Sequence, residues 1–182
     1  MKTPMSVAVA VSFGLCLLTP SSAAAVILLG ETVEVTYHFP DLATDFAGPT
    51  DVIVGAGTEL FNFAGYADID LSDTNILITT TRAAAINGTA FDGLHFFDVF
   101  GTIPALTTVL INPATSYPGL DASRITFDAD NIYINLVDLP ALQGDFISID
   151  LVAGSSAVPE PGTLGLLGAG LATLLSRRRL KS

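Results

Sequence analysis

Two carboxylates spaced two residues apart are the side chains in this sequence that most suggest chemistry. Asp68 and Asp70 lie in the stretch YADIDLS, where polar and apolar residues alternate as they do in a half-buried strand. Residues two apart on a strand point to the same face, with about 7 Å between them. Such a pair could act as the acid and the base of a small glycoside hydrolase.

The same two residues could instead contribute to a calcium site. Asp73 and Asn75 follow in the next turn, and calcium prefers six to eight oxygen ligands, so this hypothesis joins Asp68, Asp70, Asp73 and Asn75. Their spacing lacks the glycine and the distal glutamate of an EF-hand loop. A third interpretation is structural, because a face of solvated carboxylates also keeps sheet edges from aggregating.

The histidines, aromatic residues and cysteine predict no further site. His38 and His95 are not spaced as a metal-binding pair, and we expect them to be solvated or capping residues. Sugar-binding sandwiches stack sugars on exposed aromatic rings, but this chain has no Trp and its four tyrosines are scattered. The single cysteine, Cys16, lies in an N-terminal apolar run, so the body has neither disulfides nor thiol chemistry. We therefore expect a protein that is not an enzyme.

The middle of the chain, residues 26–152, predicts an all-β fold. Apolar residues recur with a period of two, and short segments of this kind alternate with turn-forming residues. The predicted strands are residues 32–39, 52–54, 59–63, 66–72, 76–81, 94–100, 107–111, 124–128, 132–137 and 146–151. We expect an antiparallel β-sandwich of about 8–10 short strands. Pro104, Pro113 and Pro118 surround the segment 107–111, which should therefore be an edge strand.

Charge is distributed very unevenly along the chain. Of the 18 acidic residues, 17 lie in residues 26–157, together with only two of the seven basic residues, Arg82 and Arg124; this segment thus carries a net charge of −15. An acidic surface without a basic stripe repels the phosphates of nucleic acids, so nucleic acid is excluded as a partner. It favours solubility and responds to divalent cations.

The N-terminus predicts export. Residues 1–25 combine an early Lys2, an apolar run, helix-breaking residues and three alanines, which is the order found in a signal peptide for the Sec translocon. Cleavage is expected after Ala23 or Ala25. The apolar run is short for a membrane span and no positively charged residue follows it.

The C-terminus predicts a membrane-spanning tail. A short linker, residues 153–157, precedes residues 158–182, in which positions 162–176 carry no charge. Extended back to residue 158, this segment has about nineteen residues, which as a helix span roughly 28 Å, close to the hydrocarbon thickness of a bilayer. Basic residues follow at once and stay cytoplasmic, so they fix the direction of insertion: Arg177, Arg178, Arg179 and Lys181. The two termini therefore predict one topology, with an N-terminal signal helix, an exported body and a C-terminal transmembrane helix.

The tail resembles a known sorting signal. Pro159, Glu160 and Pro161, a Gly/Leu-rich span and a terminal Arg cluster resemble, in this order, the PEP-CTERM signal of Gram-negative bacteria. The resemblance implies recognition by an exosortase, which is a membrane-embedded protease, and removal of the tail near the Pro-Glu-Pro motif. It also implies delivery to the cell surface or to an exopolysaccharide-containing biofilm matrix.

From these features we expect an exported structural or adhesion protein of the surface or matrix. The alternatives are a calcium- or polysaccharide-binding module and, third, a small glycoside hydrolase.

Overall fold

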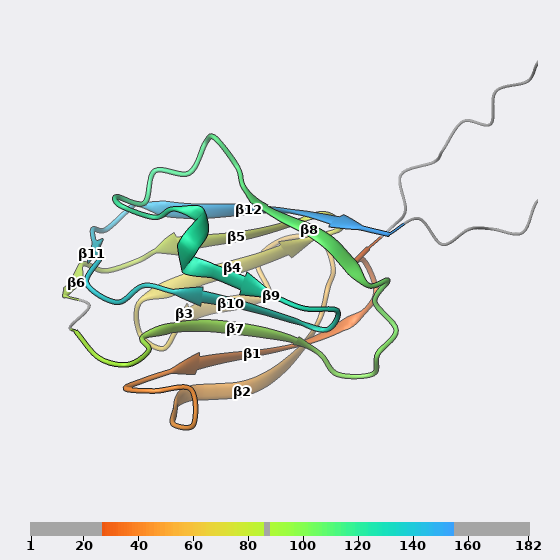
Figure 1. Cartoon of the computed structure of the whole chain (residues 1–182), viewed down its shortest axis with the longest axis horizontal. Helices are drawn as coiled ribbons and strands as arrows, with labels where there is room; N and C mark the ends of the chain where they lie inside the picture. The colour runs from red at the N-terminus through yellow and green to blue at the C-terminus, as the bar shows by residue number, and fades with distance from the viewer. Residues whose placement is uncertain (1–26, 86–87, 155–182) are drawn as a thin grey trace, which may run out of the picture.

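Alternation of apolar and polar residues produces two antiparallel sheets in the computed structural model, which describes residues 27–85 and 88–154 (Figure 1). The first sheet has the order β2 (Asp45–Ile53), β1 (Thr32–His38), β7 (Gly93–Asp98), β10 (Asn131–Asn135), β9 (Ile125–Phe127). The second has the order β3 (Leu60–Phe63), β4 (Ala67–Ser72), β5 (Asn75–Thr80), β12 (Phe146–Ala153), β8 (Leu106–Ile111). The predicted all-β class is confirmed, and the layers fit the predicted sandwich.

The core lies between the two sheets. On β1, Val33 and Val35 point inward while Glu34 does not, and the same alternation places Ile147 and Ile149 of β12 in the interior. Both of these isoleucines are fully buried, and one continuous apolar cluster joins the inner faces of the two sheets. The period-two pattern therefore specified which side of each strand faces the core.

All ten predicted strands are present, and the ends of nine of them lie within two residues of the predicted ones. The segment predicted to be an edge strand is β8, which lies at the edge of the second sheet beside β12. The structure adds a two-residue pair, β6 (Ala84–Ala85) with β11 (Pro140–Ala141), and a single 3₁₀ turn, η1 (Ala122–Arg124). These elements are too short to produce a periodic signal in the sequence.

Strand β2 is much longer than the predicted segment 52–54. Its first half contains Gly48 and Pro49 and does not alternate, so the sequence pattern did not predict a strand. β2 is an edge strand, where proline costs no ladder hydrogen bond, and its pairing with β1 is irregular on either side of Tyr37. Gly48 has φ of +87°, and a Cβ atom there would lie 2.6 Å from the Val35 carbonyl oxygen.

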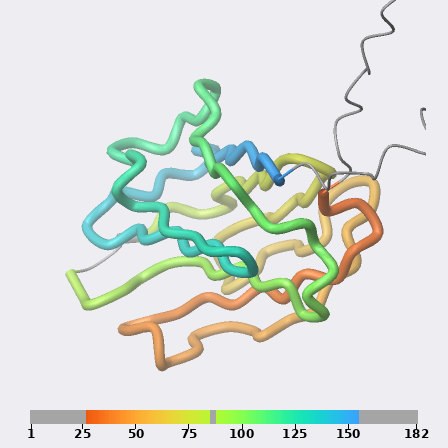
Figure 2. The backbone as a smooth tube through the Cα atoms, turned by 45° about the vertical axis from the view of Figure 1, so that its right-hand side comes forward, coloured from red at the N-terminus to blue at the C-terminus, as the bar shows by residue number. Residues whose placement is uncertain are grey.

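The described chain enters and leaves the sandwich at one end. Residues near Ile27 and the end of β12 lie together on the side opposite β6 and β11 (Figures 1 and 2). The predicted signal helix, 1–25, and the transmembrane tail, 158–182, lie outside the described residues. Among residues 27–85 and 88–154, no helix is long and apolar enough to cross a membrane.

The closest backbone approach in the first sheet generates a stability prediction. A Cβ atom at Gly93 would lie 1.9 Å from the Ile134 carbonyl oxygen of β10, which cannot rotate away because it belongs to the backbone. Gly93→Ala should therefore lower the free energy of unfolding by about 3 kcal/mol or more, measured by urea denaturation. At Gly55 the nearest atom to such a Cβ is 4.0 Å away, so Gly55→Ala should stay within about 0.5 kcal/mol of the unaltered protein. Equal midpoints for both variants would contradict the close packing of β7 on β10.

Candidate functional site

An aromatic cavity lies between the sheets at the end of the sandwich that carries β6 and β11. Its volume is about 200 Å³, and both sheets and the small β6–β11 pair contribute to its wall. The residues around it are mostly aromatic or aliphatic: Tyr37, Phe39, Phe46, Phe63, Tyr66, Ala67, Ile78, Thr80, Ala84, Asp92, Leu94, Tyr117, Leu136, Ala141 and Ile147. It is an apolar site with a few polar groups, the composition typical of small-molecule pockets.

Asp92 is the single charged residue of this wall, and it is only 5% exposed. It stands one residue before β7, where the Leu136 amide donates a 2.7 Å hydrogen bond to its backbone carbonyl. Leu94, two residues later, is also buried, so the alternation of β7 carries the Asp92 side chain inward. Burial raises the pKa of Asp92, while the hydrogen bond from Tyr37 acts in the opposite direction.

Tyr37 continues the inward-facing row of β1 and ends at this carboxylate. Its hydroxyl group donates a 2.5 Å hydrogen bond to Asp92 Oδ1. Burial, followed by the bonded carboxylate, raises the pKa of Tyr37 strongly, so its hydroxyl group remains protonated and a donor at any physiological pH. The pair places one neutral donor and one carboxyl group inside an otherwise apolar wall.

Two further tyrosines line the same cavity. Tyr117, in the loop after β8, is 6% exposed, and burial raises its pKa to about 12. Tyr66 lies just before β4, and the Arg82 Cζ atom is 4.7 Å from the centroid of its ring. The expectation of scattered tyrosines was therefore wrong, since three of the four meet around one cavity. They come from sequence positions that only the pairing of the strands brings together.

The cavity wall suits binding better than acid–base hydrolysis. A glycoside hydrolase of the common type needs two carboxyl groups on opposite sides of the scissile bond. Asp92 is the single carboxyl group among the lining residues.

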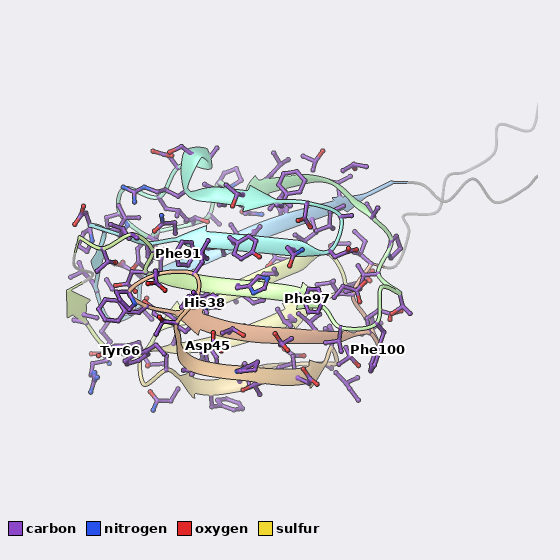
Figure 3. All side chains as sticks on the ribbon, turned by 60° about the horizontal axis from the view of Figure 1, so that its bottom comes forward. His38, Asp45, Tyr66, Phe91, Phe97 and Phe100 are labelled. Atoms are coloured by element: carbon purple, nitrogen blue, oxygen red, sulfur yellow. The ribbon has the colours of Figure 1, made fainter. Side chains whose placement is uncertain are left out.

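The two histidines form a second polar feature, on the outer face of the first sheet. His38 Nε2 and His95 Nδ1 are 3.4 Å apart, and His95 Nε2 lies 2.9 Å from Asn131 Oδ1. At the other end, His38 Nδ1 is 3.1 Å from Asp45 Oδ1, an ion-pair contact without hydrogen-bond geometry (Figure 3). The expectation of solvated or capping histidines was wrong for His38, which is 8% exposed.

The hydrogen-bond partner of His95 Nε2 fixes which nitrogen of that ring carries a proton. Asn131 Nδ2 donates to Asp128, so Asn131 offers its oxygen to His95 Nε2, which must then carry a proton. In the neutral ring, His95 Nδ1 then carries no proton and can accept a hydrogen bond from His38 Nε2, 3.4 Å away.

Burial among aromatic rings takes His95 out of water and so opposes a positive charge on it. Tyr133 stacks on His95 with a centroid distance of 4.2 Å and an angle of 6°, and Phe91 packs edge-on against His38. Burial is the main cause that lowers the pKa of His95, and His38 lowers it further, whereas the bond to Asn131 raises it.

The four residues of the calcium hypothesis make local contacts instead. Asp68 Oδ1 accepts the Asn62 amide and Asp73 Oδ1 accepts the Ile27 amide, each at 2.7 Å. Asn75 Nδ2 donates to Ser148 and to Asp150 on β12. Asp70, which pairs with Leu77, makes no side-chain hydrogen bond to the described residues. Within the described ranges, no three or more histidine, cysteine, aspartate or glutamate side chains gather in a group that could hold a metal ion.

Comparison with known proteins identifies only the C-terminal end of the chain. Residues 157–179 match the family model of the PEP-CTERM protein-sorting motif, which confirms the resemblance found for the tail. No curated protein and no solved structure matches the chain. The predicted sorting residues Pro159, Glu160 and Pro161 and the basic residues Arg177 to Arg179 fall inside the matched range, whereas Lys181 lies beyond it.

Asp92→Asn should change how stability depends on pH. In the folded protein the pKa of Asp92 lies above its ordinary 3.8, so this carboxyl group ionises at a lower pH in the unfolded chain. Asp92 therefore lowers the free energy of unfolding as pH rises from below 3.8 through the folded pKa. The asparagine variant lacks this loss, so its stability relative to the unaltered protein should rise across that window. Urea denaturation at several pH values measures the difference. Asp51→Asn, an exposed substitution on β2, is the matched control for replacing a carboxylate with an amide. A stability difference between Asp92→Asn and the unaltered protein that does not change with pH would contradict the raised pKa of Asp92.

The histidine pair generates a separate titration prediction. Since burial lowers the pKa of His95 below 6.5, the unfolded chain takes up the proton first and stability falls as pH falls through 6.5. In an NMR titration, the imidazole resonance that disappears in His95→Gln should have its midpoint below 6.5. In His38→Gln the other imidazole resonance should disappear, which completes the assignment of the two signals. A midpoint at or above 6.5 would contradict the burial of His95 beneath Tyr133.

Proposed function

We propose, from the premise that this chain is a PEP-CTERM protein, that its β-sandwich is a structural or adhesion module of the cell surface or extracellular matrix. The motif at residues 157–179 implies export and sorting through an exosortase, a membrane protease. In this proposal the protease removes the tail near Pro159, Glu160 and Pro161, and releases the acidic domain on the outer side. The motif is the observation that carries the proposal.

The position of the motif relative to the fold supports this order of events. The last strand, β12, ends at Ala153, and the matched motif begins at residue 157. The Gly154 amide still bonds to the Ala105 carbonyl, so the sheet contacts end just before the motif. A cut near Pro159 to Pro161 therefore removes no residue of the core and leaves both sheets intact.

The charge of the domain supports an extracellular structural role. Residues 26–157 carry 17 acidic and two basic side chains, which keeps the released domain soluble and repels it from anionic headgroups. Within the described part, most of these carboxylates are exposed or bonded to nearby backbone amides, and the one charged group of the cavity wall lacks a second carboxyl partner. These features favour a module that acts by binding and packing rather than by catalysis.

Intact-mass analysis in host cells tests the sorting proposal. The protein from the cell surface and medium should lack its tail from near Pro159 onward, whereas a strain without the exosortase should retain it. Pro159→Ala, Glu160→Ala and Pro161→Ala together should block tail removal in the host, because they remove the Pro-Glu-Pro motif that the protease would recognise. The neighbouring pair Ser155→Ala and Ser156→Ala is the control and should be processed normally. Tails that are retained in both strains, or lost in both, would refute the proposal.

A further inference from the structure

We propose that the cavity between the sheets binds a small organic ammonium ion, with Asp92 as its counter-ion and the surrounding aromatic rings as its wall. This site is independent of the sorting signal and of the surface role proposed above. Among the described residues, the structure buries the carboxyl group of Asp92 and gives it no positively charged partner.

Within residues 27–85 and 88–154, no basic side chain forms an ion pair with Asp92. The described part of the chain contains two strongly basic side chains: Arg82 lies over Tyr66, and Arg124 donates to the Val137 carbonyl at 2.6 Å. In this same part, His38 with Asp45 is the one ion-pair contact. Burying an ionised carboxylate is costly unless it is paired, and the single Tyr37 hydrogen bond satisfies only Oδ1. Oδ2 accepts no hydrogen bond from a described residue, and a bound cation would supply its missing partner.

The wall around Asp92 is of the kind that stabilises a cation. Six of the lining residues are aromatic: Tyr37, Phe39, Phe46, Phe63, Tyr66 and Tyr117. The face of an aromatic ring attracts ammonium groups, and cages of such rings bind quaternary ammonium ions. Burial holds the phenol groups of Tyr37 and Tyr117 in their neutral form, so Asp92 is the one anionic group among the lining residues. Rings and carboxylate together select for positive charge and against anions.

The size of the cavity restricts the ligand further. About 200 Å³ lies below the roughly 300–1,000 Å³ of pockets for drug-sized molecules, so the ligand must be small. Phe46, which is 53% exposed, lies on the wall and reaches solvent, which places the entrance beside the start of β2. This entrance is at the opposite end of the sandwich from the last residues of β12, where the sorting tail follows (Figure 1).

Choline and its neutral isostere 3,3-dimethyl-1-butanol test the charge requirement on the unaltered full chain. The two probes have the same shape and differ in whether nitrogen or carbon carries the three methyl groups. Three of the four tyrosines line the cavity and the chain has no Trp, so tyrosine fluorescence reports on this site directly. Choline should bind saturably and at least about tenfold more tightly than the neutral probe. Equal binding of the two probes, or no saturable choline binding, would overturn the proposal.

Two variants separate the contributions of the carboxylate and the rings. Asp92→Asn keeps the shape of the side chain and should reduce choline affinity at least about tenfold while leaving the neutral probe unaffected. Asp51→Asn, an exposed substitution outside the cavity wall, should leave both affinities unchanged. Phe46→Leu removes an exposed ring and should weaken choline more than the neutral probe without unfolding the protein. Choline affinity that is unchanged in Asp92→Asn would refute the role of Asp92 as counter-ion.

Discussion

The structure depends on the burial of two apolar sheet faces against each other. Between residues 27 and 154 the chain has no cysteine, so no disulfide holds the sheets together. The inner faces are built from β-branched and leucine side chains, such as Ile69, Ile76 and Ile149, that are almost fully buried. Removing such faces from water is the main favourable contribution to folding, at about 25 cal/mol per Å² of apolar surface. Because this contribution is non-directional, the turns and edges must determine the register.

Acidic side chains stabilise several of the turns between the strands. Asp98 accepts bonds from the amides of Phe100, Gly101 and Ile103, and so closes the turn that follows β7. Asp128 accepts the amides of Asp130 and Asn131 in the turn before β10. A carboxylate that accepts backbone amides satisfies donors that a short turn leaves unpaired. The high negative charge of the domain therefore arises partly from turn formation and does not require a bound metal ion.

The sequence predicted local features well and contacts between distant segments poorly. Alternation identified every main strand, and prolines identified β8 as an edge, because both signals lie within a few residues. The first half of β2 was missed, since its pairing with β1 relies on the irregular register around Tyr37 rather than on a pattern of its own. The meeting of Tyr37 with Asp92, 55 positions apart, depends on which strands pair and could not be deduced from spacing. The tail was predictable for the opposite reason, because its signal is a short linear motif.

The two ends of the sandwich differ in how much space their side chains leave unfilled between the sheets. Toward the chain termini, mostly aliphatic side chains from both sheets, such as Leu28, Leu71 and Leu151, leave a space of only about 30 Å³. Toward β6 and β11, large rings from β1 and β2 replace these aliphatic residues and leave about 200 Å³ unfilled around Asp92. The atoms that line this unfilled space lack packing contacts on one side, and a ligand could restore them. That cavity lies at the end of the sandwich opposite the last residues of β12, so the proposed site is remote from the point at which the described chain ends.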